Sequence, residues 1–451
     1  MKKNQKEYKQ KEVEALEQIN LDAAGIDIGA EENYVAIPPG RDEKSVRVFG
    51  TYTADLIATA DWLADCGVKT VAMESTGVYW IPLYELLESR GFEVYLVNAR
   101  HLKNVPGRQT DVSACQWLQQ LHTYGLLAAS FRPPEHICAV RALVRQREML
   151  IRYRAAHIQH MQKALIQMNI QLTQVISDIT GVTGLKIIRA IVAGQHNPVE
   201  LAQYRQSQCA KSEDEIAKAL EGNYRREHLF VLKQALKMYD FYGQQLEECD
   251  QELAAMYQEF EPAEPATDPP NPKSGKRRKN QPFFDLGQEL FRLTGVDLTQ
   301  IDGLDALSVQ TILSEVGTDL SPWPTVKHFA SWLRLAPNNR ITGGKVKGSS
   351  TGKTDNPATT AFRVAAQSLA RSDSELGAFY RHIKVKHGAP KAVTATAHKL
   401  ARIFYFMLKR REPYRDRGAD YFQQQHKEKA IRSLMRRAAK LGLQLLPLEA
   451  T

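Results

Sequence analysis

Three acidic residues on separate parts of the chain are the best candidates for chemistry. Asp27 interrupts a short apolar run, Glu74 follows a second apolar run, and Asp111 stands where a helix would begin. An acid inside a buried strand is costly unless a cation pairs with it. Carboxylate oxygens suit Mg²⁺ or Mn²⁺, and such ions can assist phosphoryl transfer. We therefore predict these three residues as catalytic metal ligands, although singly Asp111 could be a helix cap and Glu74 a surface acid.

A second candidate site is the segment 338–354, which is rich in glycine, hydroxyl groups and basic residues. Glycines let a backbone approach phosphate closely, and cations stabilise phosphoryl charge in a transition state. A P-loop is excluded because Lys347 stands where that motif needs glycine. The alternative is a solvated loop. The basic residues predicted to contact nucleic acid in this segment are Arg340, Lys345, Lys347 and Lys353.

Two other basic stretches are predicted to contact the nucleic-acid backbone. One opens a long helix and carries Arg141, Arg145 and Arg152, with Glu148 as the only acid between residues 141 and 160. The other ends a proline-rich linker, in which the basic residues are Lys276, Arg277 and Arg278. The alternative interpretations are a solvated helix face and a tract that only aids solubility.

The elements that must position the acids alternate between strands and helices. Apolar runs bounded by turn residues predict strands, and apolar residues at helical spacing predict helices. This order indicates an α/β domain with a ribonuclease H-like core. The expected strands are Ala23–Ile28, Tyr34–Ile37, Val46–Phe49, Thr70–Met73 and Glu93–Val97, and the expected helices are Ala54–Cys66 and Val78–Ser89.

The middle of the chain carries apolar residues at alternating intervals of three and four, first from Ile158 to Val175 and again from Leu229. This spacing predicts two long helices of an antiparallel coiled coil. Further on, Ile301–Leu304 resembles a helix-hairpin-helix turn in a mainly helical domain. The predicted organisation is a helical arm (1–20), an α/β catalytic domain (21–130), a coiled coil (131–260), a proline-rich basic linker (261–283), a helical C-terminal domain (284–415) and a basic tail (416–451).

Composition sets broad limits on function. The 451 residues carry a net charge of +9, with 43% hydrophobic and 25% charged residues, which is typical of a globular protein of several domains. No apolar run reaches the roughly eighteen residues of a membrane span, so no membrane association is expected. The five cysteines have no Cys-x-x-Cys spacing, which argues against a disulfide framework or a zinc site and favours a reducing cytoplasm.

Taken as a set and in order, four blocks resemble the DEDD-type insertion-sequence transposases. They are Gly25–Asp27, Glu74–Gly77, Thr110–Val112 and Leu335–Lys345. The resemblance covers residues 20–410. It implies a RuvC-like nuclease domain joined through a coiled coil to a C-terminal serine-type transposase domain. It also implies recombination of DNA, both element ends and target, by a homo-oligomer (dimer or tetramer) guided by a non-coding RNA of the element.

Two positions depart from the pattern of that family. The third block should end in a second aspartate three residues after Asp111, but this position is Ala114, which cannot bind a metal ion. The family's nucleophilic serine falls on Thr342, whose hydroxyl is a bulkier but chemically competent nucleophile. Ser349 and Ser350 are the fallback nucleophiles. The predicted enzyme is therefore an RNA-guided transposase whose cleavage is weakened at Ala114.

Two alternatives of other classes remain. A catalytically inactive RNA- and DNA-binding protein would explain Ala114. A Holliday-junction-type Mg²⁺-dependent endonuclease would use the N-terminal domain alone. Covalent attachment of DNA at residue 342 would separate the recombinase from both.

Overall fold

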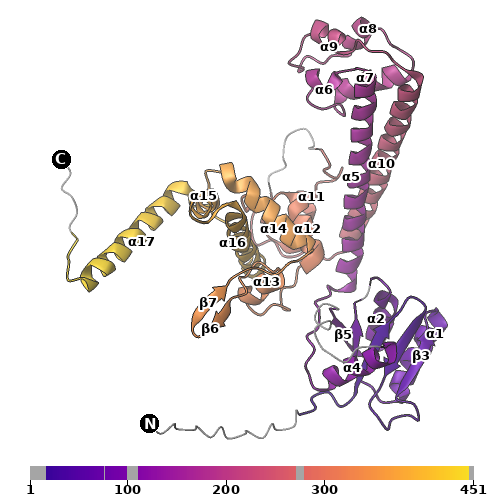
Figure 1. Cartoon of the computed structure of the whole chain (residues 1–451), viewed down its shortest axis with the longest axis vertical. Coiled ribbons are helices and arrows are strands. Elements are labelled where there is room, and N and C mark those ends of the chain that lie inside the picture. Colours follow the sequence, from indigo (N-terminus) through magenta and orange to yellow (C-terminus); the bar gives the residue numbers. More distant parts are fainter. Residues whose placement is uncertain (1–16, 76, 99–109, 271–278, 446–451) are drawn as a thin grey trace, which may run out of the picture. The chain divides into compact units, whose positions relative to one another are not determined.

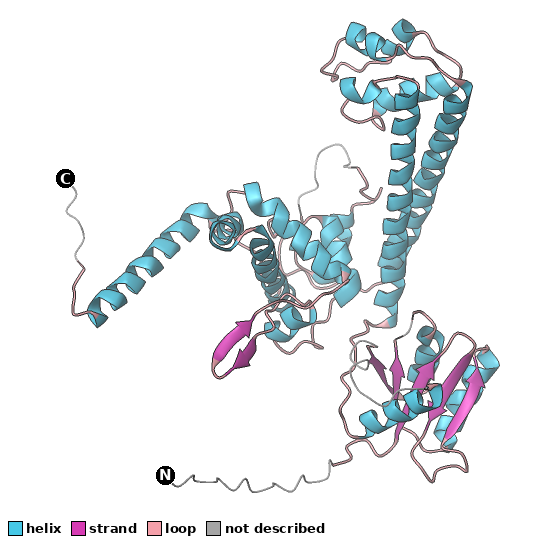
Figure 2. Cartoon of the chain, viewed as in Figure 1, coloured by secondary structure: helices cyan, strands magenta, loops and turns pink. Residues whose placement is uncertain are grey.

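The chain divides into two compact units, Met1–Arg132 and Pro133–Thr451. A computed structural model describes residues 17–75, 77–98, 110–270 and 279–445. The first unit is mixed α/β, whereas the second is mostly helical (Figure 1). Among the described residues, strands occur in a five-stranded sheet of the first unit and in one small hairpin of the second (Figure 2).

The sheet of the first unit has the strand order β3-β2-β1-β4-β5. The strand β1 (Ala23–Ile28) pairs antiparallel with β2 (Glu32–Ala36), which pairs antiparallel with β3 (Val46–Gly50). On its other side β1 pairs parallel with β4 (Thr70–Glu74), and β4 pairs parallel with β5 (Glu93–Val97). The strand that carries Asp27 is therefore the central one.

Helices cover both faces of this sheet. Because side chains alternate along a strand, Ala24, Ile26 and Ile28 point to one face, where they share a core with α1 (Thr53–Asp65) and α2 (Trp80–Ser89). The opposite face is covered by α4, whose Leu118 packs against Ala72 and Val97. The bounds of α4 are Asp111–Thr123. The odd-numbered residues of β1, including Asp27, thus point to the face that α4 covers.

The expected elements of this unit are present with small shifts. The strands predicted at 23–28 and 93–97 are confirmed at both ends. The second predicted strand lies earlier, at Glu32–Ala36. The fourth is longer than predicted, because it includes Glu74, which was expected to follow the strand. That shift matters for the site, because it places Glu74 inside the hydrogen-bonded ladder.

Two long helices, α5 (Glu135–Gln167) and α10 (Arg226–Gln258), lie side by side and run in opposite directions (Figure 1). Their shared interface contains a buried ion pair between Arg147 and Asp250. The same guanidinium donates to the carbonyl oxygen of Asn280 at 2.8 Å. The residues that follow the basic linker are thereby attached to this helix pair.

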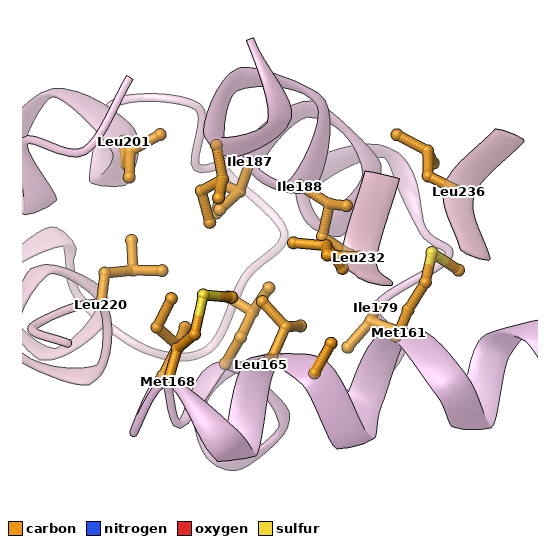
Figure 3. Packing of buried hydrophobic residues seen from close by; sticks show 14 of the residues in the cluster. Met161, Leu165, Met168, Ile179, Ile187, Ile188, Leu201, Leu220, Leu232 and Leu236 are labelled. Carbon is orange, nitrogen blue, oxygen red and sulfur yellow. The ribbon is translucent and has the colours of Figure 1, made fainter. Parts of the chain in front are cut away.

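The predicted first helix is too long. The structure ends α5 at Gln167, and Asn169 adopts a left-handed conformation with φ of 55°, so the predicted continuation from Leu172 to Val175 is a separate short helix, α6. Leu172 nevertheless packs into the same core as Leu165, which is why the apolar spacing continues through the break. That core joins the helix pair to α6–α9 (Figure 3). The bounds of these helices are Leu172–Val175, Val182–Val192, Pro198–Ala202 and Glu213–Ala219.

The C-terminal part of the second unit is helical, as expected, except for one hairpin. Phe329 and Trp323 lie in its core, where their ring centroids are 5.3 Å apart. The elements are α11 (Leu286–Thr294), η1 (Leu298–Gln300), α12 (Ala306–Val316), α13 (Val326–Trp332), β6 (Arg340–Thr342), β7 (Lys345–Gly348), α14 (Pro357–Ser368), η2 (Leu369–Arg371), α15 (Glu375–His387), α16 (Ala389–Arg410) and α17 (Gly418–Lys440).

The predicted helix-hairpin-helix turn lies between η1 and α12. Gly303 has φ of +85°, a conformation that favours glycine, and a Cβ there would lie 2.8 Å from the carbonyl oxygen of Ala365 in α14. The Asp305 side chain accepts from the backbone N–H of Ser308 at 2.9 Å and so caps α12. The turn packs against α14, and phosphate binding by it stays a prediction.

No helix in the described ranges has both the length and the apolar character that a membrane crossing requires.

Candidate functional site

Asp27 and Glu74 are brought together by strand pairing. In the parallel ladder, Gly25 lies opposite Ala72 and Ile26 opposite Met73, so the next step places Asp27 beside Glu74. Neighbouring strands are about 4.8 Å apart, and residues in register point to the same face. Both carboxylates therefore lie on the α4 side of the sheet, next to each other. Asp27 is half-buried and Glu74 is buried.

Asp111 is positioned by the first turn of α4. The hydroxyl of Thr110 accepts from the backbone N–H of Ser113 at 3.2 Å, and the Thr110 backbone N–H donates to the Ser113 hydroxyl at 2.9 Å. These reciprocal bonds fix the start of the helix at Asp111. A carboxylate in this first turn is also stabilised by the helix dipole.

Gly25 sets the distance between α4 and the sheet. A Cβ at Gly25 would lie 2.3 Å from both the carbonyl oxygen of Cys115 and the backbone nitrogen of Gln119. Neither backbone atom can move without displacing the helix. The absence of a side chain at residue 25 therefore lets α4 approach β1 closely, one helical turn from Asp111.

We expect Gly25→Ala to destabilise the first unit by about 2 kcal/mol or more, because the helix must move off the sheet. It should also impair any reaction that needs Asp27 and Asp111 together. The free energy of unfolding in urea would measure the first effect. Gly243→Ala is the matched control, because a Cβ there has no atom nearer than 3.8 Å; equal stability of the two variants would contradict this account.

The negative charges of Asp27 and Asp111 both act on the Cys115 thiol of α4. Burial raises the pKa of the Cys115 thiol to about 11, and the negative charges of Asp27 and Asp111 both add to this rise. Cys115 lies in α4 one turn after Asp111, so both acids are close to it. Within the described residues, however, no three acidic, histidine or cysteine side chains form a group that could hold a metal ion as they stand.

Ala114 is the position at which a fourth acid is expected. It lies three residues after Asp111 and is 3% exposed, so its methyl group points into the interface between α4 and the sheet. A carboxylate at this position would lie in that buried interface. Carboxylate oxygens are the donors that suit a hard divalent cation, and residue 114 contributes none.

One further polar residue at this edge, Tyr34, was missed by sequence reasoning. Tyr34 is the partner of Asp27 in the β1–β2 ladder, and its hydroxyl donates to the Glu32 carboxylate at 3.1 Å. This hydrogen bond raises the pKa of Tyr34, to which the charge of Asp111 also contributes. The alternation of side chains along the second strand could have indicated which face Tyr34 points to. Only the pairing register with the first strand, however, places Tyr34 next to Asp27.

A second residue that sequence reasoning missed is His122, which joins the C-terminal end of α4 to the sheet by a hydrogen bond. Its Nε2 lies 2.8 Å from the Thr70 hydroxyl, which itself donates to the Glu93 carbonyl oxygen at 3.0 Å. The hydroxyl must therefore accept from His122, so Nε2 carries the proton. Burial lowers the pKa of His122 to about 4, which keeps the ring neutral.

This depressed pKa predicts a loss of stability on acidification. The unfolded chain binds a proton at His122 near pH 6.5, whereas the folded chain does so only near pH 4. The stabilisation is therefore complete above pH 6.5 and is lost as the pH falls toward 4, by about 3 kcal/mol at most. Urea unfolding of the native chain and of His122→Gln, measured from pH 7 to 4, should show the steeper decline in the native chain. Parallel curves would show that His122 does not cause it.

Thr342 lies in a β-hairpin, although no strand was predicted in the segment 338–354. It is the last residue of β6 and pairs with Lys345 in β7. Gly343 and Gly344, with φ of 57° and 73°, form the two-residue turn between them. Two successive positive φ angles are typical of a tight hairpin turn that glycine permits. The two glycines therefore permit the turn, and Thr342 lies directly before it.

The predicted basic residues of this segment are exposed, and so is Thr342. Arg340 and Lys345 flank Thr342 along the hairpin, and Lys347 is two residues further along β7. The fallback nucleophiles Ser349 and Ser350 are also exposed, and the Ser350 carbonyl oxygen accepts from the backbone of Asn338 at 3.2 Å. The remaining predicted contact, Lys353, is exposed just beyond the hairpin.

Two of the three predicted helix arginines have partners within the fold. Arg145 donates to the buried Glu315 of α12 from two nitrogens, at 3.0 and 2.6 Å. Arg141 lies 3.9 Å from the same carboxylate, whereas Arg152 is exposed. These contacts attach α12 to α5, and nucleic-acid binding by the three arginines stays a prediction. Lys276, Arg277 and Arg278 lie outside the described residues.

Two protein-family models match the chain. One, for DEDD-type IS110 transposases and described as "Transposase", matches residues 24–170. The other, described as "Transposase IS116/IS110/IS902 family", matches residues 297–381. The first match contains the three acids of the α/β unit, and the second contains Thr342. The comparison with curated proteins finds no match.

Proposed function

Since this chain belongs to the IS110-type DEDD transposases, we propose that it cleaves and exchanges DNA strands of an insertion sequence with two sets of residues. One set comprises Asp27, Glu74 and Asp111 in the α/β unit. The other is the hairpin that carries Thr342. The proposal rests chiefly on the placement of Asp27 and Glu74 side by side on the face that α4 covers.

The three acids would hold a divalent cation, Mg²⁺ or Mn²⁺. Their oxygens are the hard ligands that such ions prefer, and they come from two adjacent strands and the helix that packs on them. When bound, the ion would supply charge stabilisation to a phosphoryl group in transfer. Without a cation, the dipole of α4 stabilises the negative charge of Asp111 in its first turn. A bound cation would stabilise this charge more strongly.

Thr342 would act as the nucleophile. Its hydroxyl oxygen would attack the scissile phosphorus, and a deoxyribose oxygen would leave with the proton, so that one phosphate ester replaces another. Arg340, Lys345 and Lys347 would neutralise the negative charge that develops on the phosphoryl oxygens. Support comes from the exposure of Thr342 beside a two-residue hairpin turn, with cations on both strands.

The arrangement of domains is part of the same proposal. The strand order β3-β2-β1-β4-β5, with an antiparallel first half and a parallel second half, supports a RuvC-like, ribonuclease H-like domain. The paired helices α5 and α10 support the predicted coiled coil. We further expect a homo-oligomer that acts on DNA in the cytoplasm, with target choice directed by a non-coding RNA, in which base pairing would carry sequence specificity.

Ala114 favours a second candidate function. If the apolar surface at this position prevents cation binding, the chain would bind RNA and DNA without cutting either. An endonuclease that uses only the α/β unit would differ again, because it would nick DNA and leave no attached product.

A DNA attachment assay separates these functions. The full chain is incubated with Mg²⁺, the RNA of the element and labelled DNA ends, and covalent products are resolved after denaturation. Label that comigrates with protein and maps to the peptide of Thr342 supports the transposase. Nicked DNA without attachment supports the endonuclease, and nucleic-acid binding with neither product supports the binding protein.

A further inference from the structure

A cation-lined cavity in the second unit lies beside α16 and the segment that connects it to α17. Its volume is about 370 Å³. That size lies near the lower end for small-ligand pockets, so it suits one compact group and excludes a helix. One wall is apolar and is formed by Ile403, Phe406 and Met407. The cations that line the cavity come from α16 itself and from the connecting segment.

The charges around this cavity do not balance. Lys399 donates to Glu375 at 2.8 Å, and Glu412 lies 4.0 Å from Arg410, so these two lining residues are already compensated. The remaining lining cations are Arg402 and Arg415. In the part of the chain that the structure describes, neither of these guanidinium groups has an acidic partner. The cavity thus presents two uncompensated positive charges next to an apolar wall.

Tyr414 is another residue that lines the cavity, and it holds the connecting segment against the fold. Its side chain is half-buried, and burial together with the charges of Asp416, Asp302 and Glu375 raises its pKa, so its hydroxyl stays protonated. Asp416 also accepts from the backbone N–H of Glu375 at 2.9 Å, which attaches the connecting segment to the start of α15. The segment that carries Arg415 is therefore anchored on both sides of it.

We propose that this cavity binds one unpaired nucleotide of an RNA or DNA strand, with its base against the apolar wall and its phosphates at Arg402 and Arg415. A flat ring beside an anion matches an apolar and aromatic wall beside two free guanidinium groups. A base within a duplex is stacked and paired, so only an unpaired or extruded nucleotide could enter. This inference rests on the proposed function, because the cavity would give the proposed transposase a contact with single-stranded nucleic acid.

The course of the protein chain favours a nucleic-acid strand as the ligand instead of a free mononucleotide. The connecting segment leads directly into α17, whose exposed basic residues continue away from the cavity. A backbone that leaves the cavity along this helix would keep meeting cations, as strand-binding proteins require. The exposed cations of α17 that could follow the strand are Lys429, Arg432, Arg436, Arg437 and Lys440.

Photo-crosslinking of the full chain tests the proposal. The probe is a single-stranded DNA of about 12 nucleotides with one 5-iodouracil, a length in the range of known strand-binding sites. Crosslinked peptides are mapped by mass spectrometry. We expect crosslinks between residues 402 and 415, and few with the same sequence in a duplex. Crosslinks confined to other peptides would overturn the proposal.

Substitutions then assign the cavity residues. The double variant Arg402→Gln with Arg415→Gln should lower crosslinking about tenfold, and it should reduce the slope of log affinity against log salt by about 1.4, as expected for two lost phosphate contacts. Phe406→Leu should lower crosslinking without changing that slope. The matched control, Lys384→Gln with Lys386→Gln, removes the same charge from exposed residues of α15. An equal loss in the control would show a general charge effect and overturn the site.

Competition identifies the ligand source. Efficient crosslinking of free 5-iodouridine monophosphate, unaffected by excess oligonucleotide, would indicate a mononucleotide site instead of a strand site. Displacement of the probe by polyglutamate but not by oligonucleotide would indicate an acidic peptide. Neither readout needs cleavage. Crosslinks in the cavity without DNA attachment by Ala114→Asp would refute the proposed function alone. Attachment without cavity crosslinks would refute only this inference.

Discussion

Ala114→Asp is expected to raise Mg²⁺-dependent attachment of DNA by about 10²-fold or more, since one cation ligand contributes several kcal/mol to phosphoryl transfer. Residue 114 is 3% exposed in the interface between α4 and the sheet, three residues after Asp111. A carboxylate there would join Asp27 and Glu74 on the same face. It would complete a set of four acids where the native chain has three.

A buried carboxylate also predicts a signature that does not depend on activity. Without a cation, Ala114→Asp brings a fourth negative charge into a partly buried cluster, which should lower the melting temperature of the first unit. Mn²⁺ should reverse this loss in the variant and have a smaller effect on the native chain. Titration calorimetry with Mn²⁺ would measure the expected gain in affinity directly.

Gln116→Asp is the matched control for this substitution. It adds the same charge to the same helix, but residue 116 is exposed on the outer face of α4. We expect no gain in attachment or in Mn²⁺ affinity from it. If both variants behaved alike, or if neither changed attachment, residue 114 would not belong to a cation site, and the interpretation as a binding protein would gain most.

Thr342→Val is expected to abolish attachment, by at least about 10³-fold, when it is made together with Ala114→Asp. Valine keeps the branched shape of threonine and removes only the hydroxyl. Because Thr342 is exposed at the end of β6, the hairpin and the stability of the unit should not change. Attachment is measured on denaturing gels and the modified peptide by mass spectrometry.

Thr342→Ser should retain attachment and increase it, because a primary hydroxyl reaches the phosphorus with less crowding. Thr351→Val, a half-buried threonine beyond the hairpin, is the matched control for the valine substitution. Retained attachment in Thr342→Val, together with its loss in Ser349→Ala or Ser350→Ala, would assign the nucleophile to one of those serines instead.

Much of the α/β unit follows from local sequence. The strands at Ala23–Ile28 and Glu93–Val97 were predictable because buried strands are short apolar runs between turn residues. The hairpin at Arg340–Gly348 was not predicted, because its strands have only three and four residues, and the glycines of this segment were interpreted as letting the backbone approach phosphate. The end of α5 was missed because Leu172 packs into the same core from the next helix.

Long-range ion pairs were also beyond local reasoning. The basic start of α5 predicted contact with nucleic acid, but Arg145 pairs with Glu315, 170 residues away in the chain. A buried acid near the end of a largely apolar helix, as Glu315 is in α12, gives no local sign of its partner. The hydrogen bond between His122 and Thr70 was missed for the same reason.

The sequence alone determined which acids exist, their order along the chain, the strand that carries Asp27, the helix start at Asp111, and the departures at Ala114 and Thr342. These are properties of single positions and of local periodicity. Only the tertiary structure decided that Asp27 lies beside Glu74, that Gly25 lets α4 approach the sheet, and that residue 114 points inward. Strand register and the packing of a helix depend on contacts between segments far apart in the chain, which no local pattern records.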